Sequence, residues 1–118
     1  MKPNPLIAEA HRLVPNIAKG QAAVYFLRLN SGTIYVGCST TLDQRLDDHL
    51  CGQACRTTQV DSPAAILRVE ILPTFSEARR REAQLKRWSR AKKEALIRGE
   101  LTVLRKLSHS RSAARTKN

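Results

Sequence analysis

The sequence has few aromatic residues, few cysteines and no long hydrophobic run, and each shortage argues against a class of protein. Aromatic residues make up only 4% of the 118 residues, which argues against a broad base-stacking platform of the single-strand-binding kind. No apolar run approaches the roughly 20 residues of a membrane span, and no hydrophobic signal core follows the N-terminus. We therefore predict a cytoplasmic protein without a membrane partner.

Cysteine usage gives no sign of a stabilising framework. The chain has three cysteines, and an odd number does not indicate a set of disulfides. The order His49, Cys51, Cys55, with Cys38 nearby, suggests zinc at first sight, but its spacing fits no standard zinc motif. We interpret the cysteines as small buried or half-buried thiols.

Acidic residues are also scarce relative to basic ones. Ten Asp and Glu stand against 21 Lys and Arg, which gives a formal net charge of +11. Such an excess indicates a polyanionic partner. Residues 109–118 are polar and basic, and we predict that they form a disordered tail that adds sequence-independent attraction for phosphates. A chain of this length suggests one domain with a modest core.

Residues 24–52 are the most informative stretch, with the pattern of a strand, a turn, a second strand and a helix. Apolar side chains alternate with the period of two that paired strands show. Residues 30–32 supply a three-residue turn in which the glycine takes a positive φ. This loop length sets Tyr25 opposite Gly37 and puts Tyr25 and Tyr35 on one face. We expect Gly37 to leave open space there, giving a small concave spot that carries two phenols.

The helix that follows brings an arginine and a histidine to the same region. Thr41 and Gln44 match the capping box that opens a helix. Arg45 and His49 are four residues apart and therefore stand together on one side. This pair beside two tyrosines is typical of an anion site with a titratable group. The apolar stripe that we expect to pack on the sheet consists of Leu42, Leu46 and Leu50.

Further along the chain we predict a loop, a third strand and a second helix. Residues 56–63 have the composition of a polar loop, and residues 65–72 form an apolar run with β-branched residues that is typical of a strand. A second capping box, Thr74 with Glu77, opens a helix that reaches about Trp88. Its inward positions are predicted to be Ala78, Leu85 and Trp88.

Glu82 lies on this inward side, whereas the outer positions of the helix are almost uniformly basic. A carboxylate on a buried side is costly unless it is paired or bound to a cation. The periodicity leaves two interpretations open, an internal ion pair with Arg45 or Arg81 and a metal ligand.

Taken together, these residues resemble the GIY-YIG nuclease domain family, and the small stand-alone members most. Ala-Val-Tyr at 23–25 and Tyr-Val-Gly at 35–37 stand about ten residues apart, and Arg45 follows ten residues after the second tyrosine. The agreement continues through His49 and Gly52 and returns in residues 75–97. It covers roughly residues 22–108. Two differences are that Ala23 replaces the opening glycine and that Cys38 stands where some relatives place a lysine.

The resemblance implies an α/β (α+β) fold, with a small three-stranded antiparallel sheet flanked by helices, the third strand added antiparallel. It also implies an endonuclease that hydrolyses phosphodiester bonds in DNA with one divalent ion, Mg²⁺ or Mn²⁺, held by Glu82. Arg45 would bridge phosphate oxygens, and one of the two tyrosines would act as the base, helped by positive charge from Arg45, the metal and a protonated His49. The implied catalytic set is Tyr25, Tyr35, Arg45 and His49. The nucleic-acid contacts predicted from the basic surface are Lys86, Arg87, Arg90 and Lys92.

Outside the nuclease-like region the sequence is less informative. Residues 1–21 form an N-terminal extension in which a short helix is predicted, either to cap the sheet or to mediate self-association. Residues 22–108 form the nuclease-like domain. The alternative function is a non-catalytic DNA- or RNA-binding module that keeps the nuclease fold, and Cys38 in place of a lysine keeps this open. DNA is favoured over RNA as the partner.

Overall fold

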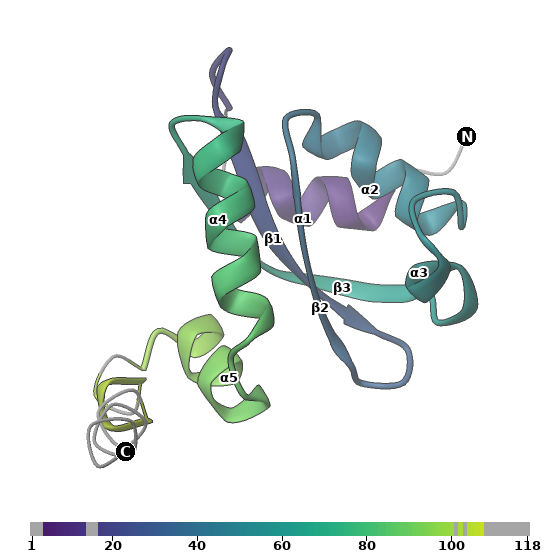
Figure 1. Cartoon of the computed structure of the whole chain (residues 1–118). Helices are drawn as coiled ribbons and strands as arrows, with labels where there is room; N and C mark the ends of the chain where they lie inside the picture. Colours follow the sequence, from purple (N-terminus) through teal and green to yellow (C-terminus); the bar gives the residue numbers. More distant parts are fainter. Residues whose placement is uncertain (1–3, 14–16, 101, 103, 108–118) are drawn as a thin grey trace. The chain divides into compact units, whose positions relative to one another are not determined.

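The computed structural model describes residues 4–13, 17–100, 102 and 104–107 (Figure 1). The chain divides into two compact units, Met1–Lys86 and Arg87–Asn118. The second unit contains helix α5 (Arg90–Arg98), and the tail predicted at 109–118 lies outside the described residues. The first unit contains, in chain order, α1 (Pro5–Leu13), β1 (Ala22–Leu29), β2 (Ile34–Ser39), α2 (Leu42–Leu50), α3 (Arg56–Val60), β3 (Pro63–Leu72) and α4 (Phe75–Lys86).

The three strands form one antiparallel sheet in the order β2-β1-β3, so the predicted fold class is confirmed. The hairpin turn has the predicted three-residue length, because the Leu29 N–H donates to the Thr33 carbonyl at 2.8 Å. Gly32 takes φ +95° within it, a value that favours glycine. The register sets Tyr25 opposite Gly37 as predicted. Because β2 and β3 are the outer strands, β1 is the central one.

Helices cover both faces of the sheet, which explains why almost all of β1 is buried. On one face α1 and α2 pack over β1, β2 and β3, while α4 contacts the sheet separately (Figure 1). The alternation along β1 sends Val24 and Phe26 to the α4 side, where Ala78 and Leu85 are the buried residues of α4. The core on the α1 and α2 side contains Leu6, Ala10, Ala23, Tyr25, Leu27, Leu29, Leu42, Leu46 and Ile66.

Helix α1 therefore caps the sheet, one of the two roles considered for the N-terminal extension. Leu6 and Ala10 are its buried residues. Two polar contacts join it to α2: Asn4 Nδ2 donates to Asp47 Oδ1 at 2.7 Å, and His11 Nε2 lies 2.9 Å from Asp43 Oδ2. The boundary of the extension at residue 21 stays a prediction.

Two expectations about the helices around residue 50 were wrong. Residues 56–60 form the helix α3 rather than a loop, since a five-residue helix is too short to show a periodic pattern. Leu50 is 38% exposed and lies at the end of α2 rather than in the core.

The capping box at Thr41 is also absent, because both of its side chains have other partners. Thr41 occupies the N-cap position but its side chain makes no cap hydrogen bond, and its hydroxyl lies 3.4 Å from Ser39 Oγ. The Gln44 amide donates to Asp48 Oδ1 instead. The second predicted cap is present, since the Glu77 N–H donates to Thr74 Oγ1 at 3.1 Å.

Trp88 was wrongly placed on the inward face of α4. The helix ends at Lys86, and Ser89 starts a new one by accepting the Lys92 N–H on its hydroxyl. Trp88 follows α4 in the sequence and belongs to the second unit, where Lys92 Nζ lies 4.2 Å from its ring centroid. None of the helices in the described part of the chain combines the length and the hydropathy that a membrane span requires.

Candidate active site

A buried hydrogen-bonded chain links the two central residues of the candidate site. Tyr25 on β1 and His49 on α2 are both fully buried, and the Tyr25 hydroxyl lies 2.7 Å from His49 Nε2. His49 Nδ1 lies 2.9 Å from the hydroxyl of Thr58, which is also buried. Because buried polar groups need partners, this chain explains how three polar side chains tolerate the core.

Burial, together with the positive charge of Arg45, lowers the pKa of His49 to about 4. The imidazole is therefore neutral near pH 7 and carries one proton. We assign that proton to Nδ1, which donates to Thr58, while Nε2 accepts from the Tyr25 hydroxyl. The expectation that a protonated His49 supplies positive charge was wrong, because desolvation disfavours the charged form.

The open space expected beside Tyr25 is filled by the tyrosine itself. A Cβ added at Gly37 would meet the Cζ and hydroxyl oxygen of Tyr25 at 2.6 Å. The phenol ring therefore lies directly over the glycine, and the predicted concave spot is not present there. The fit explains why the Tyr-Val-Gly tripeptide ends in a residue without a side chain.

Tyr35 on β2 is only half-buried, unlike Tyr25. Its ring centroid lies 5.3 Å from that of His49 in an edge-to-face arrangement, and its hydroxyl accepts from the Cys55 thiol at 3.6 Å. Burial raises the pKa of both phenols. The side chains of the protein alone therefore keep both phenols protonated at neutral pH.

Arg45 is the half-exposed cation of this cluster. Its donor groups and its positive charge act on the Tyr25 hydroxyl and offset part of the rise in the pKa of Tyr25. An arginine has five donors and no acceptor, so it leaves the Tyr25 proton to His49. The guanidinium therefore lies near the buried chain while it remains within reach of solvent.

Glu82 reaches the same region from α4, on the other face of the sheet. Its Oε1 accepts from the Cys38 thiol at 3.5 Å, and its Oε2 lies 3.4 Å from Lys86 Nζ. Its side chain is 18% exposed, so it is neither fully buried nor paired with Arg45 or Arg81 as the ion-pair interpretation expected. The partner of Arg81 is Glu70, at 2.8 Å.

The candidate residues therefore come from both faces of the sheet and meet at its edge, rather than sharing one face. Side-chain alternation along β2 puts Tyr35 and Gly37 on the α2 side and Cys38 on the α4 side. Glu82 still acts electrostatically on Tyr25. The two sets meet at Gly37 because this position has no side chain and β2 is an outer strand.

A metal ion would find a single carboxylate in this region. No group of three or more His, Cys, Asp or Glu side chains comes together anywhere in the described part of the chain. Mg²⁺ usually keeps several waters and needs only one or two carboxylates from the protein. Glu82, partly exposed and with weak partners, fits such a water-rich ion.

The predicted nucleic-acid contacts are divided between the two units. Lys86 ends α4 in the first unit, where it neighbours Glu82. Arg87, Arg90 and Lys92 belong to the second unit. Within that unit, Arg90 pairs with Glu94 at 3.2 Å.

Sequence reasoning missed two residues of the cluster, Thr58 and Cys55. Thr58 belongs to α3, in the stretch predicted to be a polar loop, and Cys55 occupies the N-cap position of this helix, one residue before that stretch. Thr58 orients the His49 ring, and Cys55 donates to Tyr35. The available signal was weak, because a threonine in a polar stretch is expected to face solvent.

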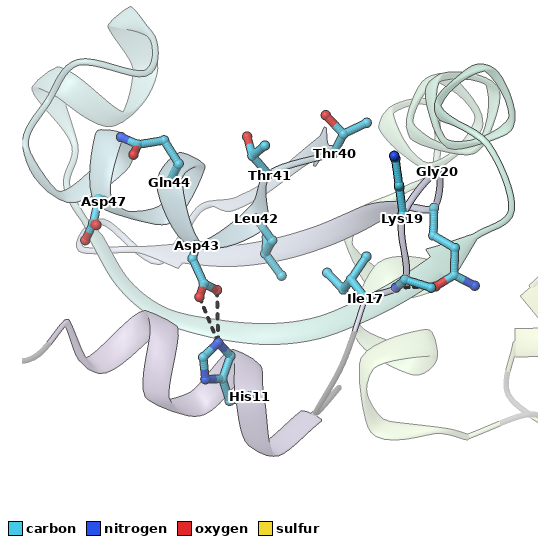
Figure 2. Close-up of a pocket in the computed structure, with 12 residues that line it drawn as sticks. His11, Ile17, Lys19, Gly20, Thr40, Thr41, Leu42, Asp43, Gln44 and Asp47 are labelled. Carbon is cyan, nitrogen blue, oxygen red and sulfur yellow. Dashed lines mark hydrogen bonds and ion pairs between the residues drawn. The ribbon is translucent and has the colours of Figure 1, made fainter.

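A cavity of about 810 Å³ lies elsewhere in the first unit, between α1, residues 17–21 and the start of α2 (Figure 2). None of the predicted site residues lines it. Its two carboxylates, Asp43 and Asp47, are held by His11 and Asn4, and Figure 2 shows the His11 contact closing one side.

Comparison with known proteins shows which sequences this chain is similar to. The sequence profile of the GIY-YIG catalytic domain matches residues 21–95. A UPF0213 protein of Halobacterium salinarum is 37% identical over 74 residues, which is 63% of this chain and 96% of that protein. One of Staphylococcus saprophyticus is 32% identical over 63% of this chain and 90% of its own. The solution NMR structure of a UPF0213 protein from Bacillus halodurans, 32% identical, superposes with a TM-score of 0.44 over 65% of this chain and 82% of that one.

Proposed function

The chain belongs to the GIY-YIG family of nuclease domains, and from this premise we propose that it is a divalent-metal-dependent endonuclease that hydrolyses phosphodiester bonds in DNA. The observation that carries the proposal is the meeting of the Tyr25–His49–Arg45 cluster with Glu82 at the outer strand β2. Such an edge gives an extended nucleic-acid strand access to groups from both faces of the sheet.

Glu82 is the residue that would hold the ion. A divalent cation there supplies positive charge to the phosphate and the leaving oxygen. Arg45, half-exposed and close enough to Tyr25 to act on its pKa, would bind the phosphate oxygens as a bidentate donor. Lys86 would hold a neighbouring phosphate of the strand, and Arg87 and Arg90 of the second unit would add cationic contacts. Lys92 was predicted to do the same, but this residue is only 8% exposed and its Nζ lies against the Trp88 ring.

The two tyrosines take different roles in this proposal. Tyr35 is half-buried and would contact the attacking water, whereas Tyr25 is fully buried and its proton is committed to His49. Burial raises the pKa of Tyr35, so its phenolate, the form that accepts a proton from water, is scarce at neutral pH, and the rate should increase as the pH rises. His49 acts as a neutral acceptor that orients Tyr25.

The second candidate function is a nucleic-acid-binding module without useful turnover. It is favoured by the raised pKa values of both phenols and by Cys38, which gives the site a thiol where some relatives place a lysine. A binding module needs the +11 charge but not the Tyr35 hydroxyl. The cytoplasmic location stays a prediction.

The experiment that separates the two functions measures cleavage and binding together. Supercoiled plasmid and a single-stranded oligonucleotide are each incubated with pure protein in Mg²⁺ and, in parallel, in chelator. We expect cutting only with Mg²⁺, a loss on the order of 10²–10⁴ in rate for Tyr35→Phe, and a smaller loss for Tyr25→Phe. DNA of both kinds that is bound but never cut under any of these conditions would favour the binding module.

A further inference from the structure

Helix α4 presents one exposed aromatic side chain close to the proposed metal ligand. Phe75 is 42% exposed, although it starts a helix whose other exposed residues are mostly charged or polar. The Arg79 guanidinium lies 5.8 Å from its ring centroid. The ring is therefore held by a cation yet keeps a large part of its surface in water.

Phe75 lies on the same side of α4 as Glu82. Residues seven apart on an α-helix differ by only about 20° in direction and by roughly 10 Å along the axis. Arg79 and Lys86 stand one turn before and after Glu82, and they share this side as well. The stripe that we name the α4 edge consists of Phe75, Arg79, Glu82 and Lys86.

Contacts to the sheet show which strand the α4 edge follows. Glu82 accepts from Cys38 of β2, and both Arg79 and Lys86 act electrostatically on the same thiol. The opposite side of the helix follows the other outer strand, because Arg81 pairs with Glu70 of β3. The α4 edge therefore runs along β2, the strand where the candidate active site lies.

We propose that Phe75 stacks on an unpaired nucleobase of the substrate strand while Arg79 and Lys86 hold the adjacent phosphates. The charges of the α4 edge complement a phosphate backbone, and aromatic faces bind bases of any sequence. A base inside an intact duplex is covered on both sides by its neighbours, so the partner must have an exposed base close to the cleaved bond. The substrate class is therefore single-stranded or branched DNA rather than continuous duplex. The inference rests on the proposed function and deepens it.

The test measures binding without cleavage, so that it is independent of turnover. Affinities for a labelled single-stranded oligonucleotide and for its duplex are measured in chelator with the parent protein and three variants. Phe75→Leu keeps apolar volume but removes the ring, Phe75→Trp keeps an aromatic face, and Val60→Ala removes an exposed apolar side chain elsewhere, 71% exposed on α3.

We expect Phe75→Leu to lose about 5- to 100-fold in affinity for the single strand, the range for one lost base stack, with little change for the duplex. Phe75→Trp and Val60→Ala should bind like the parent. Parent-like single-strand binding by Phe75→Leu at matched thermal stability would overturn the inference, as would an equal loss for duplex. A protein that keeps this Phe75-dependent preference but never cuts would refute the endonuclease while leaving the base contact intact.

Discussion

At the residue scale, the protein keeps a neutral histidine at the centre of a buried chain that runs from Thr58 through His49 to Tyr25. Each member is hydrogen-bonded to the next. The Thr58 hydroxyl accepts a hydrogen bond from His49 Nδ1 at 2.9 Å, and His49 Nε2 accepts one from the Tyr25 hydroxyl at 2.7 Å. The positive charge of Arg45 acts on the Tyr25 end of this chain. The half-exposed guanidinium is linked in this way to a buried chain that begins at Thr58.

Replacing Thr58 by valine should disturb this chain without changing the volume of the side chain. The His49 Nδ1–H would lose its acceptor, and leaving one buried polar group unsatisfied costs about 1–3 kcal/mol of unfolding free energy. The ¹⁵N chemical shifts of the His49 ring should show a change in tautomer. Thr58→Ser should retain both properties, and Thr57→Val, at an exposed position of the same helix, serves as the control. An unchanged tautomer in Thr58→Val would remove Thr58 from the chain.

His49 also gives the protein a specific sensitivity to acid. Its pKa is lowered from 6.5 to about 4 by burial, so the unfolded chain takes up the proton at a higher pH than the folded one. The free energy of unfolding is therefore unaffected by protonation of His49 above pH 6.5. It decreases as the pH falls from 6.5 towards 4, by a total on the order of 3 kcal/mol. Chemical denaturation across this range should show the loss in the parent and a smaller one in His49→Gln. Parallel curves for the two proteins would contradict the assignment.

At the element scale, α1 is an addition to the matched family region that nevertheless belongs to the core. The profile match begins at residue 21, yet Leu6 of α1 is only 2% exposed and packs with Tyr25, the buried tyrosine of the site. Helix α1 thus closes the face of the sheet that holds the buried chain. Its two polar contacts to α2 set where it docks.

Truncating Leu6 to alanine should therefore destabilise the whole first unit. A buried leucine replaced by alanine costs about 2–5 kcal/mol, depending on how far the cavity collapses. Leu13→Ala, at a 41% exposed position of the same helix, should change the unfolding free energy far less. The comparison is made by urea denaturation. Equal effects of the two substitutions would mean that α1 does not pack on the sheet in solution.

The elements also show which parts of the fold the sequence could predict. The hairpin register followed from a period of two and a glycine turn, both local signals, and the structure has Tyr25 opposite Gly37 as predicted. Helix α3 was missed because five residues cannot show a helical period. The burial of His49 was missed because a four-residue spacing from Arg45 places the two together on the helix surface but does not show what covers them. Thr58, which covers one side of the ring, comes from that same unpredicted helix.

At the scale of the whole molecule, the features that favour nucleic-acid binding differ from those that hydrolysis would need. A net charge of +11 attracts phosphates wherever the basic side chains stand, so nucleic-acid binding fits both a nuclease and a binding module. In the proposed mechanism, hydrolysis requires Glu82 next to β2, whereas binding does not. The second unit contributes cations and, in its described residues, none of the proposed catalytic side chains.

The most direct test of the account compares two similar carboxylates in single-turnover cleavage with Mg²⁺. Glu82 and Glu70 are 18% and 14% exposed, and both lie within reach of basic side chains. Replacing each by glutamine keeps the shape and removes the charge. We predict that Glu82→Gln loses on the order of 10³ in rate, the equivalent of several kcal/mol of transition-state stabilisation, and that it binds DNA in chelator as well as the parent does or better. Glu70→Gln should lose stability but cut at close to the parent rate once folded. Parent-like cleavage by Glu82→Gln, or an equal loss in both variants, would contradict the account.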